Sequence, residues 1–113
     1  MTKVPGDRTR PALELLDEVV RRVVEVASPD RIILFGSAAR GEAGDDSDLD
    51  LLVVKAGVPH RRRLAQRVYR GLLGLEVSVD VLVVTPEDIR AFENKPGTII
   101  GPALRDGREV YVS

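Results

Sequence analysis

The residues best suited to chemistry in this sequence are a Gly-Ser pair, an Asp-x-Asp pair and one further aspartate. Gly36 and Ser37 end the apolar run at residues 31–35, and ten residues later Asp48 and Asp50 open the apolar run at 49–55. Asp80 interrupts a third apolar run, VSVDVLVV, at residues 77–84. Clustered carboxylates beside a glycine and a hydroxyl favour metal-assisted chemistry on a nucleotide phosphate.

The three aspartates form a candidate metal site. Residues two apart on a strand point to the same face, so Asp48 and Asp50 project together. Like charges this close raise each other's pKa unless a cation lies between them. Magnesium meets this need, because it takes carboxylate oxygens and keeps water and substrate phosphate as further ligands. Asp80 projects from the face of its strand opposite to that of its neighbouring valines. It becomes a third ligand if its strand lies beside that of Asp50.

The Gly-Ser pair is a candidate phosphate-binding site. Gly36 allows close approach of the backbone, and Ser37 offers a hydroxyl and an N–H. A helical turn over residues 37–40 would favour an anion at its N-terminus. Arg40 has two open interpretations, a phosphate contact or an ion pair with the acidic loop, which carries Glu42, Asp45 and Asp46.

Apolar periodicity predicts alternating helices and strands. Residues 31–35 and 49–55 are joined by residues 36–47, a loop too short for a parallel crossover but sufficient for an antiparallel pair. The fold class is therefore α/β (α+β), a small mixed sheet with helices on one face. The predicted helices span residues 11–27, 59–73, 86–94 and 98–104, and the predicted strands span 31–35, 49–55, 77–84 and 109–112.

Length and composition narrow the class of protein. With 113 residues, the chain is expected to form a single domain at 11–113 after a flexible tail at 1–10. The 43% apolar and 31% charged content is typical of a globular protein, and the absence of cysteine excludes disulfides and thiolate chemistry. The net charge of −1 argues against a nucleic-acid partner. No apolar run reaches membrane-spanning length, so no membrane role and a cytoplasmic location are expected.

The stretch GSAARGEAGDDSDLDLLVV at residues 36–54 resembles the signature of the DNA polymerase β-like nucleotidyltransferases. It is most similar to the minimal nucleotidyltransferases, the MNT (MntA-like) antitoxins that pair with HEPN proteins, and ALRDGREVYV at 103–112 resembles their usual ending. The resemblance implies the polymerase β-like fold over residues 11–112. It also implies that Gly36 and Ser37 hold the triphosphate, that Asp48 and Asp50 bind two Mg²⁺ ions, and that Asp80 is the third acid, beside the acceptor hydroxyl.

That family resemblance implies AMP transfer from ATP to a tyrosine of a helical HEPN toxin, within a hetero-oligomer of a type VII toxin–antitoxin system. Only residues 85–113 follow the third apolar run, so we expect another chain to supply acceptor recognition. Two alternatives remain open, an antitoxin that acts by binding alone and a small-molecule nucleotidyltransferase of the antibiotic-modifying type. One face of the predicted helix at residues 59–73 is strongly basic and carries Arg61, Arg62, Arg63, Arg67 and Arg70. This face is either solvated or a docking surface for an acidic partner or RNA.

Overall fold

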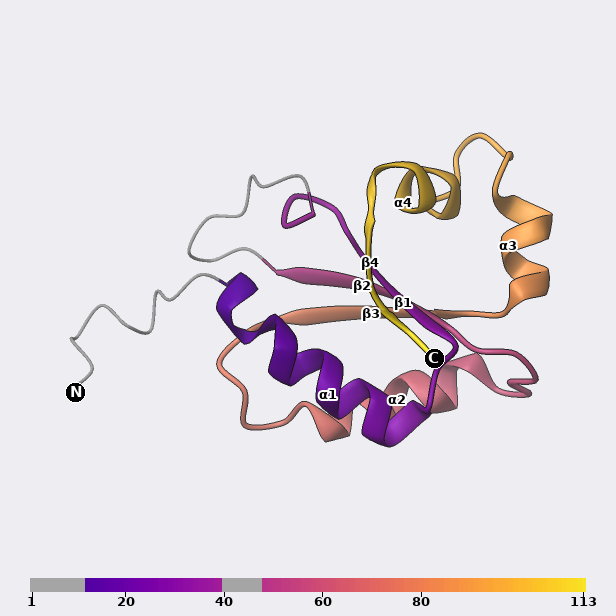
Figure 1. Ribbon diagram of the computed structural model, residues 1–113. Coiled ribbons are helices and arrows are strands. Elements are labelled where there is room, and N and C mark those ends of the chain that lie inside the picture. The colour runs from indigo at the N-terminus through magenta and orange to yellow at the C-terminus, as the bar shows by residue number, and fades with distance from the viewer. Residues whose placement is uncertain (1–11, 40–47) are drawn as a thin grey trace.

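The computed structural model describes residues 12–39 and 48–113 (Figure 1). The predicted tail at residues 1–10, the acidic loop and Arg40 lie outside the described residues. The elements are a 3₁₀ turn η2 (Ala12–Leu15), helices α1 (Leu16–Ala27), α2 (Arg61–Gly71), α3 (Pro86–Phe92) and α4 (Ile100–Asp106), and strands β1 (Arg31–Phe35), β2 (Leu49–Val54), β3 (Val79–Val84) and β4 (Arg108–Val112).

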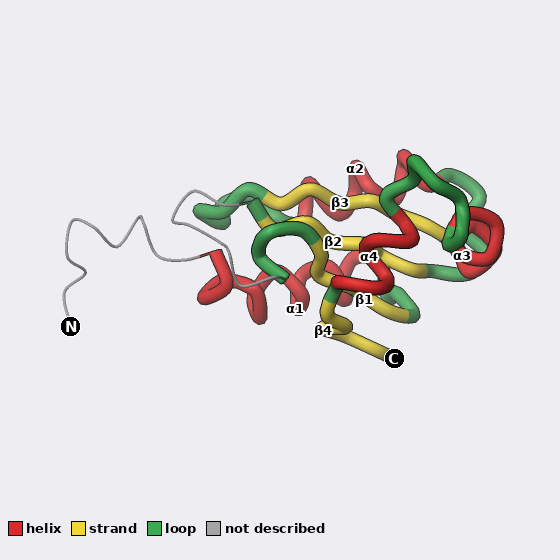
Figure 2. The backbone as a smooth tube through the Cα atoms, turned by 90° about the horizontal axis from the view of Figure 1, so that it is seen from above, coloured by secondary structure: helices red, strands yellow, loops and turns green. Residues whose placement is uncertain are grey.

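The four strands form one mixed sheet in the order β3-β2-β1-β4. Strand β1 pairs antiparallel with both β2 and β4, and β2 pairs parallel with β3. The predicted mixed sheet and the antiparallel β1–β2 pair are both confirmed. Helix α2 provides the long crossover that a parallel pair requires. Figure 2 shows β3 and β4 at the two edges of the sheet.

The two long helices cover one face of this sheet, as the sequence predicted. Helices α1 and α2 lie together below the strands in Figure 1. Their apolar side chains recur every three or four residues, so they form one stripe that packs against alternate residues of the strands. The resulting core is formed by Val19, Val23, Ala27, Ile32, Leu34, Leu51, Val53, Leu64, Val68, Leu72 and Val83, among others.

The short helices depart from the prediction that helices lie on one face only. Helices α3 and α4 lie on the opposite side of the strands (Figure 1), where Ile100 and Ala103 of α4 pack against Ile33 and Leu52. The physical reason is that β1 and β2 are apolar at consecutive positions, so both faces of these strands need cover. Helix α4 packs against β1 and leaves the first half of β3 exposed on this face.

Helix α3 begins as the sequence predicted. Thr85 is the N-cap and Pro86 the first helical residue, and the Asp88 N–H donates to the Thr85 hydroxyl at 3.1 Å. The Asp88 carboxylate accepts from the Thr85 N–H at 2.9 Å, which completes a capping box. Among the described residues, no helix combines the length and apolar character needed to cross a bilayer.

Candidate functional site

Asp50 and Asp80 lie directly beside each other on neighbouring strands. The parallel pairing of β2 with β3 places them in register. Asp50 lies two residues before Leu52, and Asp80 two residues before Leu82, so each acid projects from the same face as its leucine. This is the face on which α4 lies, because Leu52 packs against that helix. The predicted condition for Asp80 to join the acids of β2, that the two strands are neighbours, is met.

The acids interact electrostatically. The pKa of Asp50 is raised, first by burial and then by the negative charges of Asp80 and Asp48, with a hydrogen bond to Asp80 acting in the same direction. The charges of Asp48 and Asp80 therefore both act on Asp50 at this end of the sheet. A bound cation or proton would relieve this repulsion.

Gly36 lies against the same carboxylate from the other side. It follows β1, whose last residue Phe35 pairs with Asp50 across the antiparallel ladder. Its φ is +77°, a left-handed conformation that favours glycine. A Cβ built on Gly36 would overlap the Asp50 carboxylate. Only glycine fits between the turn and this acid without a shift of one of them.

Ser37 occupies a tight turn directly beyond this glycine. The Ala39 N–H donates to the Gly36 carbonyl at 3.1 Å, and Ala38 is buried beneath the turn. Ser37 is half-buried. The predicted helical turn is a single turn over residues 37–39, and its last predicted residue, Arg40, is outside the described residues.

The donor chemistry of the three aspartates fits a hard divalent cation such as Mg²⁺, which prefers carboxylate oxygens. Within residues 12–39 and 48–113, however, no group of three or more Asp, Glu, His or Cys side chains has an arrangement ready to hold a metal ion. Asp48 is exposed just before β2 begins. The three-aspartate magnesium site therefore stays a prediction.

A pocket beside the acids was not predicted from the sequence. We call it the α4 pocket; it has a volume of about 330 Å³ and lies between Asp50 and helix α4. Its lining includes Phe35, Gly36, Asp50, Ile99, Pro102 and Asp106. The sequence contains no local signal for it, since Asp106 reads as a turn residue and only the packing of α4 on β1 brings it near Asp50.

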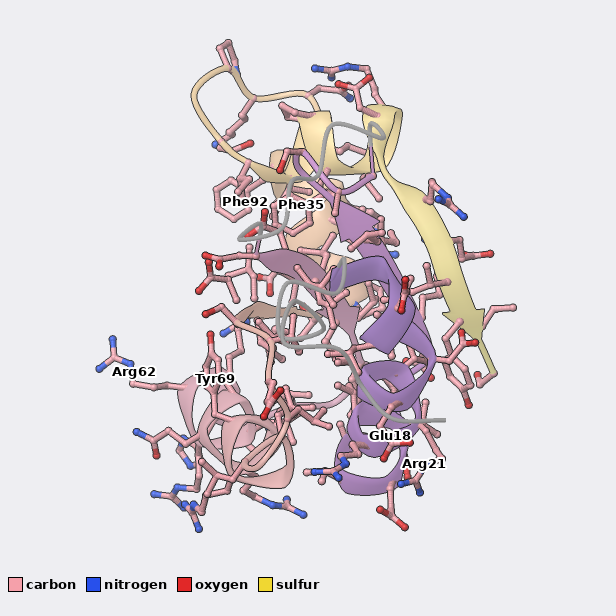
Figure 3. All side chains as sticks on the ribbon, turned by 90° about the vertical axis from the view of Figure 1, so that its left-hand side faces the viewer. Glu18, Arg21, Phe35, Arg62, Tyr69 and Phe92 are labelled. Atoms are coloured by element: carbon pink, nitrogen blue, oxygen red, sulfur yellow. The ribbon has the colours of Figure 1, made fainter. Side chains whose placement is uncertain are left out.

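The basic face of α2 is partly used within the fold. Arg61 donates two hydrogen bonds to the Asp88 carboxylate, at 2.6 and 2.8 Å, and holds the pKa of that carboxyl below its usual range. Figure 3 looks onto the end of the molecule on the left of Figure 1, where Tyr69 points from α2 toward the strands and Arg62 points outward. The Tyr69 hydroxyl accepts from the Val81 N–H of edge strand β3 at 2.8 Å.

Comparison with known protein families and curated proteins points to one activity. The nucleotidyltransferase domain family matches residues 14–102 of this chain. A protein of Methanocaldococcus jannaschii named "Putative protein adenylyltransferase MJ1305" is 36% identical over 83 residues. That match covers 66% of this chain and 56% of the relative, so the chain spans little more than half the length of that protein.

Solved structures share the fold. A crystal structure of a putative nucleotidyltransferase from Sulfolobus solfataricus matches with a TM-score of 0.63 and 24% identity, covering 99% of this chain and 92% of that one. A toxin–antitoxin structure with AMP-PNP matches with a TM-score of 0.55 and 19% identity, covering 86% of this chain and 73% of that one. A mutant of the toxin–antitoxin pair MntA-HpeT matches with a TM-score of 0.54 and 16% identity, covering 86% and 72%.

Proposed function

The chain belongs to the nucleotidyltransferase domain family, and we propose that it transfers AMP from ATP, with Mg²⁺, to a hydroxyl group of a partner protein. The observation that carries this proposal is the in-register pair of Asp50 and Asp80 with Gly36 against Asp50. A nucleotidyltransferase needs carboxylates for metal beside a backbone that phosphates can approach closely, and these residues supply both.

Each residue has a role in the proposed reaction. Gly36 and Ser37 hold the triphosphate through the backbone and the serine hydroxyl, and Arg40 neutralises part of its charge. Asp48, Asp50 and Asp80 hold Mg²⁺, which when bound supplies positive charge against the phosphates. The acceptor oxygen bonds to the α-phosphorus, the bond from that phosphorus to the bridging oxygen breaks, and pyrophosphate leaves. Asp80, on the outer strand, assists removal of the acceptor proton.

The acceptor in this proposal is a tyrosine of a helical HEPN toxin, held in a hetero-oligomer with this chain. Two observations support a protein acceptor. The curated relative is named as a protein adenylyltransferase, and two structures with the same fold are toxin–antitoxin complexes, one of them with AMP-PNP. The toxin–antitoxin likeness also favours a second candidate function, neutralisation of the partner by binding alone.

A transfer assay separates these two functions. The chain is incubated with Mg²⁺, ATP labelled at the α-phosphorus, and the protein encoded by the neighbouring gene. We expect label on a tyrosine of the partner, and a loss of at least about 100-fold in the Asp48→Asn/Asp50→Asn double variant. A matched control is Glu76→Gln, which changes an exposed acid that makes no ion pair within the described residues.

Two results would count against catalysis. One is the absence of label on the partner with the wild-type chain. The other is equal labelling by the wild-type chain and the double variant. If the double variant still binds the partner and still protects against it, neutralisation by binding is sufficient.

A further inference from the structure

The chemistry of the α4 pocket differs from that of a phosphate site. Among the described residues that line it, the only charged groups are the carboxylates of Asp50 and Asp106, and the others are apolar apart from Gly36. The proposed Mg²⁺ would offset the charge of Asp50, whereas the Asp106 carboxylate has no cationic partner within the described residues and repels phosphate. The pocket instead fits a neutral, partly apolar group that carries hydrogen-bond donors. Its volume of about 330 Å³ lies within the range of small-molecule sites, roughly 300–1,000 Å³.

The direction of the pocket from Asp50 matters for the proposed reaction. Strand β2, which carries Asp50, lies between β3 with Asp80 and β1, which leads into Gly36 and Ser37. An in-line displacement needs the acceptor and the departing pyrophosphate on opposite sides of the α-phosphorus. The acceptor lies beside Asp80 and the pyrophosphate beside Ser37 in this reaction. The nucleoside, which stays bonded to the α-phosphorus, must therefore extend from it in another direction. The face of the sheet toward α4 is such a direction, and the pocket lies there.

The groups that line the pocket on the helix side are available to a ligand. Ile99 is 49% exposed, and Pro102 is exposed beside it. Asp106 is exposed, and its carboxylate makes no ion pair or side-chain hydrogen bond within the part of the chain that the structure describes. Apolar side chains and an unpaired carboxylate therefore line the same pocket.

Resting on the proposed function, we infer that the α4 pocket receives the nucleoside part of ATP. Ile99 and Pro102 pack against the base, and Asp106 accepts a hydrogen bond from a donor on the nucleoside, a ribose hydroxyl or an exocyclic amino group. This makes Ile99 and Asp106 specificity-determining residues for the nucleotide. Phosphate binding remains with Gly36 and Ser37, at the turn that follows β1 on the rim of this pocket.

Binding measurements on the full chain test this assignment. Calorimetry with Mg²⁺ compares two probes, α,β-methylene-ATP, which cannot release pyrophosphate, and inorganic tripolyphosphate, which has no nucleoside. Asp106→Asn and Ile99→Ala are each expected to raise the Kd of the ATP analogue about tenfold, with the Kd of tripolyphosphate unchanged. The matched controls Glu76→Gln and Leu73→Ala change an exposed acid and an exposed leucine outside the pocket, and should bind both probes as wild type does.

Two further analogues identify the donor. Loss of the Asp106→Asn effect with a 2′-deoxy analogue assigns the contact to the ribose, and its loss with an analogue lacking the 6-amino group assigns it to the base. The inference is overturned if wild type binds both probes and the pocket variants bind the ATP analogue equally well. It is also overturned if the variants weaken tripolyphosphate to the same extent. Failure of wild type to bind either probe would instead overturn the proposed function, and this inference with it.

Discussion

Replacing Gly36 by alanine should damage catalysis more than stability. Two effects act at this position. An alanine at a φ of +77° costs about 1–2 kcal/mol, because its Cβ crowds the backbone in the left-handed region. The new Cβ also overlaps the Asp50 carboxylate, which must swing away from its position beside Asp80 at about 1 kcal/mol for a strained rotamer.

Gly57 offers a matched control for the first effect alone. Its φ is +74°, and a Cβ built there meets no atom within 4 Å. Gly57→Ala should therefore lose about 1–2 kcal/mol, and Gly36→Ala about 2–3 kcal/mol. In a chain of this size, these losses correspond to Tm decreases of about 4–16 °C and 8–24 °C.

Thermal unfolding and the transfer rate, measured well below both midpoints, separate stability from catalysis. We expect Gly57→Ala to keep the wild-type transfer rate and Gly36→Ala to lose about 100-fold, because a displacement of about 1 Å at a catalytic group has that cost. Wild-type transfer by Gly36→Ala, or equal rate losses in the two variants, would refute the placement of Gly36 and Asp50 in one site.

Three further substitutions test other parts of the structure. The raised pKa of Asp50 means that the folded state holds this proton more tightly than the unfolded chain, so its contribution to stability falls as pH rises from the ordinary Asp range through the raised pKa. Urea unfolding without Mg²⁺ should therefore show Asp50→Asn more stable than wild type at pH 7, with no gain at pH 3. Thr85→Ala removes the hydroxyl that accepts from the Asp88 N–H and should cost about 1 kcal/mol of unfolding free energy, measured in the same way. Tyr69→Phe removes the acceptor for the Val81 N–H and should cost about 0.5–1.5 kcal/mol, with faster amide exchange at Val81; unchanged exchange would contradict this contact.

The local elements follow closely from the sequence because their signals are local. Strand β1 has the predicted bounds, since Asp30 and Gly36 flank a short β-branched run. Helix α3 starts at Pro86, where the Thr-Pro pair predicted its cap. Strand β3 begins two residues later than predicted, because β2 starts at Leu49 and Val79 is its first partner.

The shared face of Asp50 and Asp80 could be predicted from the sequence, but the surroundings of these acids could not. Side chains alternate between the two faces of a strand. The residues that share a face with Asp50 or with Asp80 could therefore be identified within each strand before the pairing of the strands was known. The packing of α4 on β1 depends on contacts between distant parts of the chain, and so does the position of Asp106. The same is true of the pairing of Arg61 with Asp88, which no periodicity in either helix predicts.

The most direct test of nucleotidyl transfer uses ATP labelled separately at the α- and γ-phosphorus, with Mg²⁺ and the partner protein. Attack at the α-phosphorus predicts that the acceptor gains the α label and that the γ label leaves as pyrophosphate, one equivalent for each AMP transferred. Transfer of the γ label to the acceptor, or release of single phosphate instead of pyrophosphate, would contradict the account.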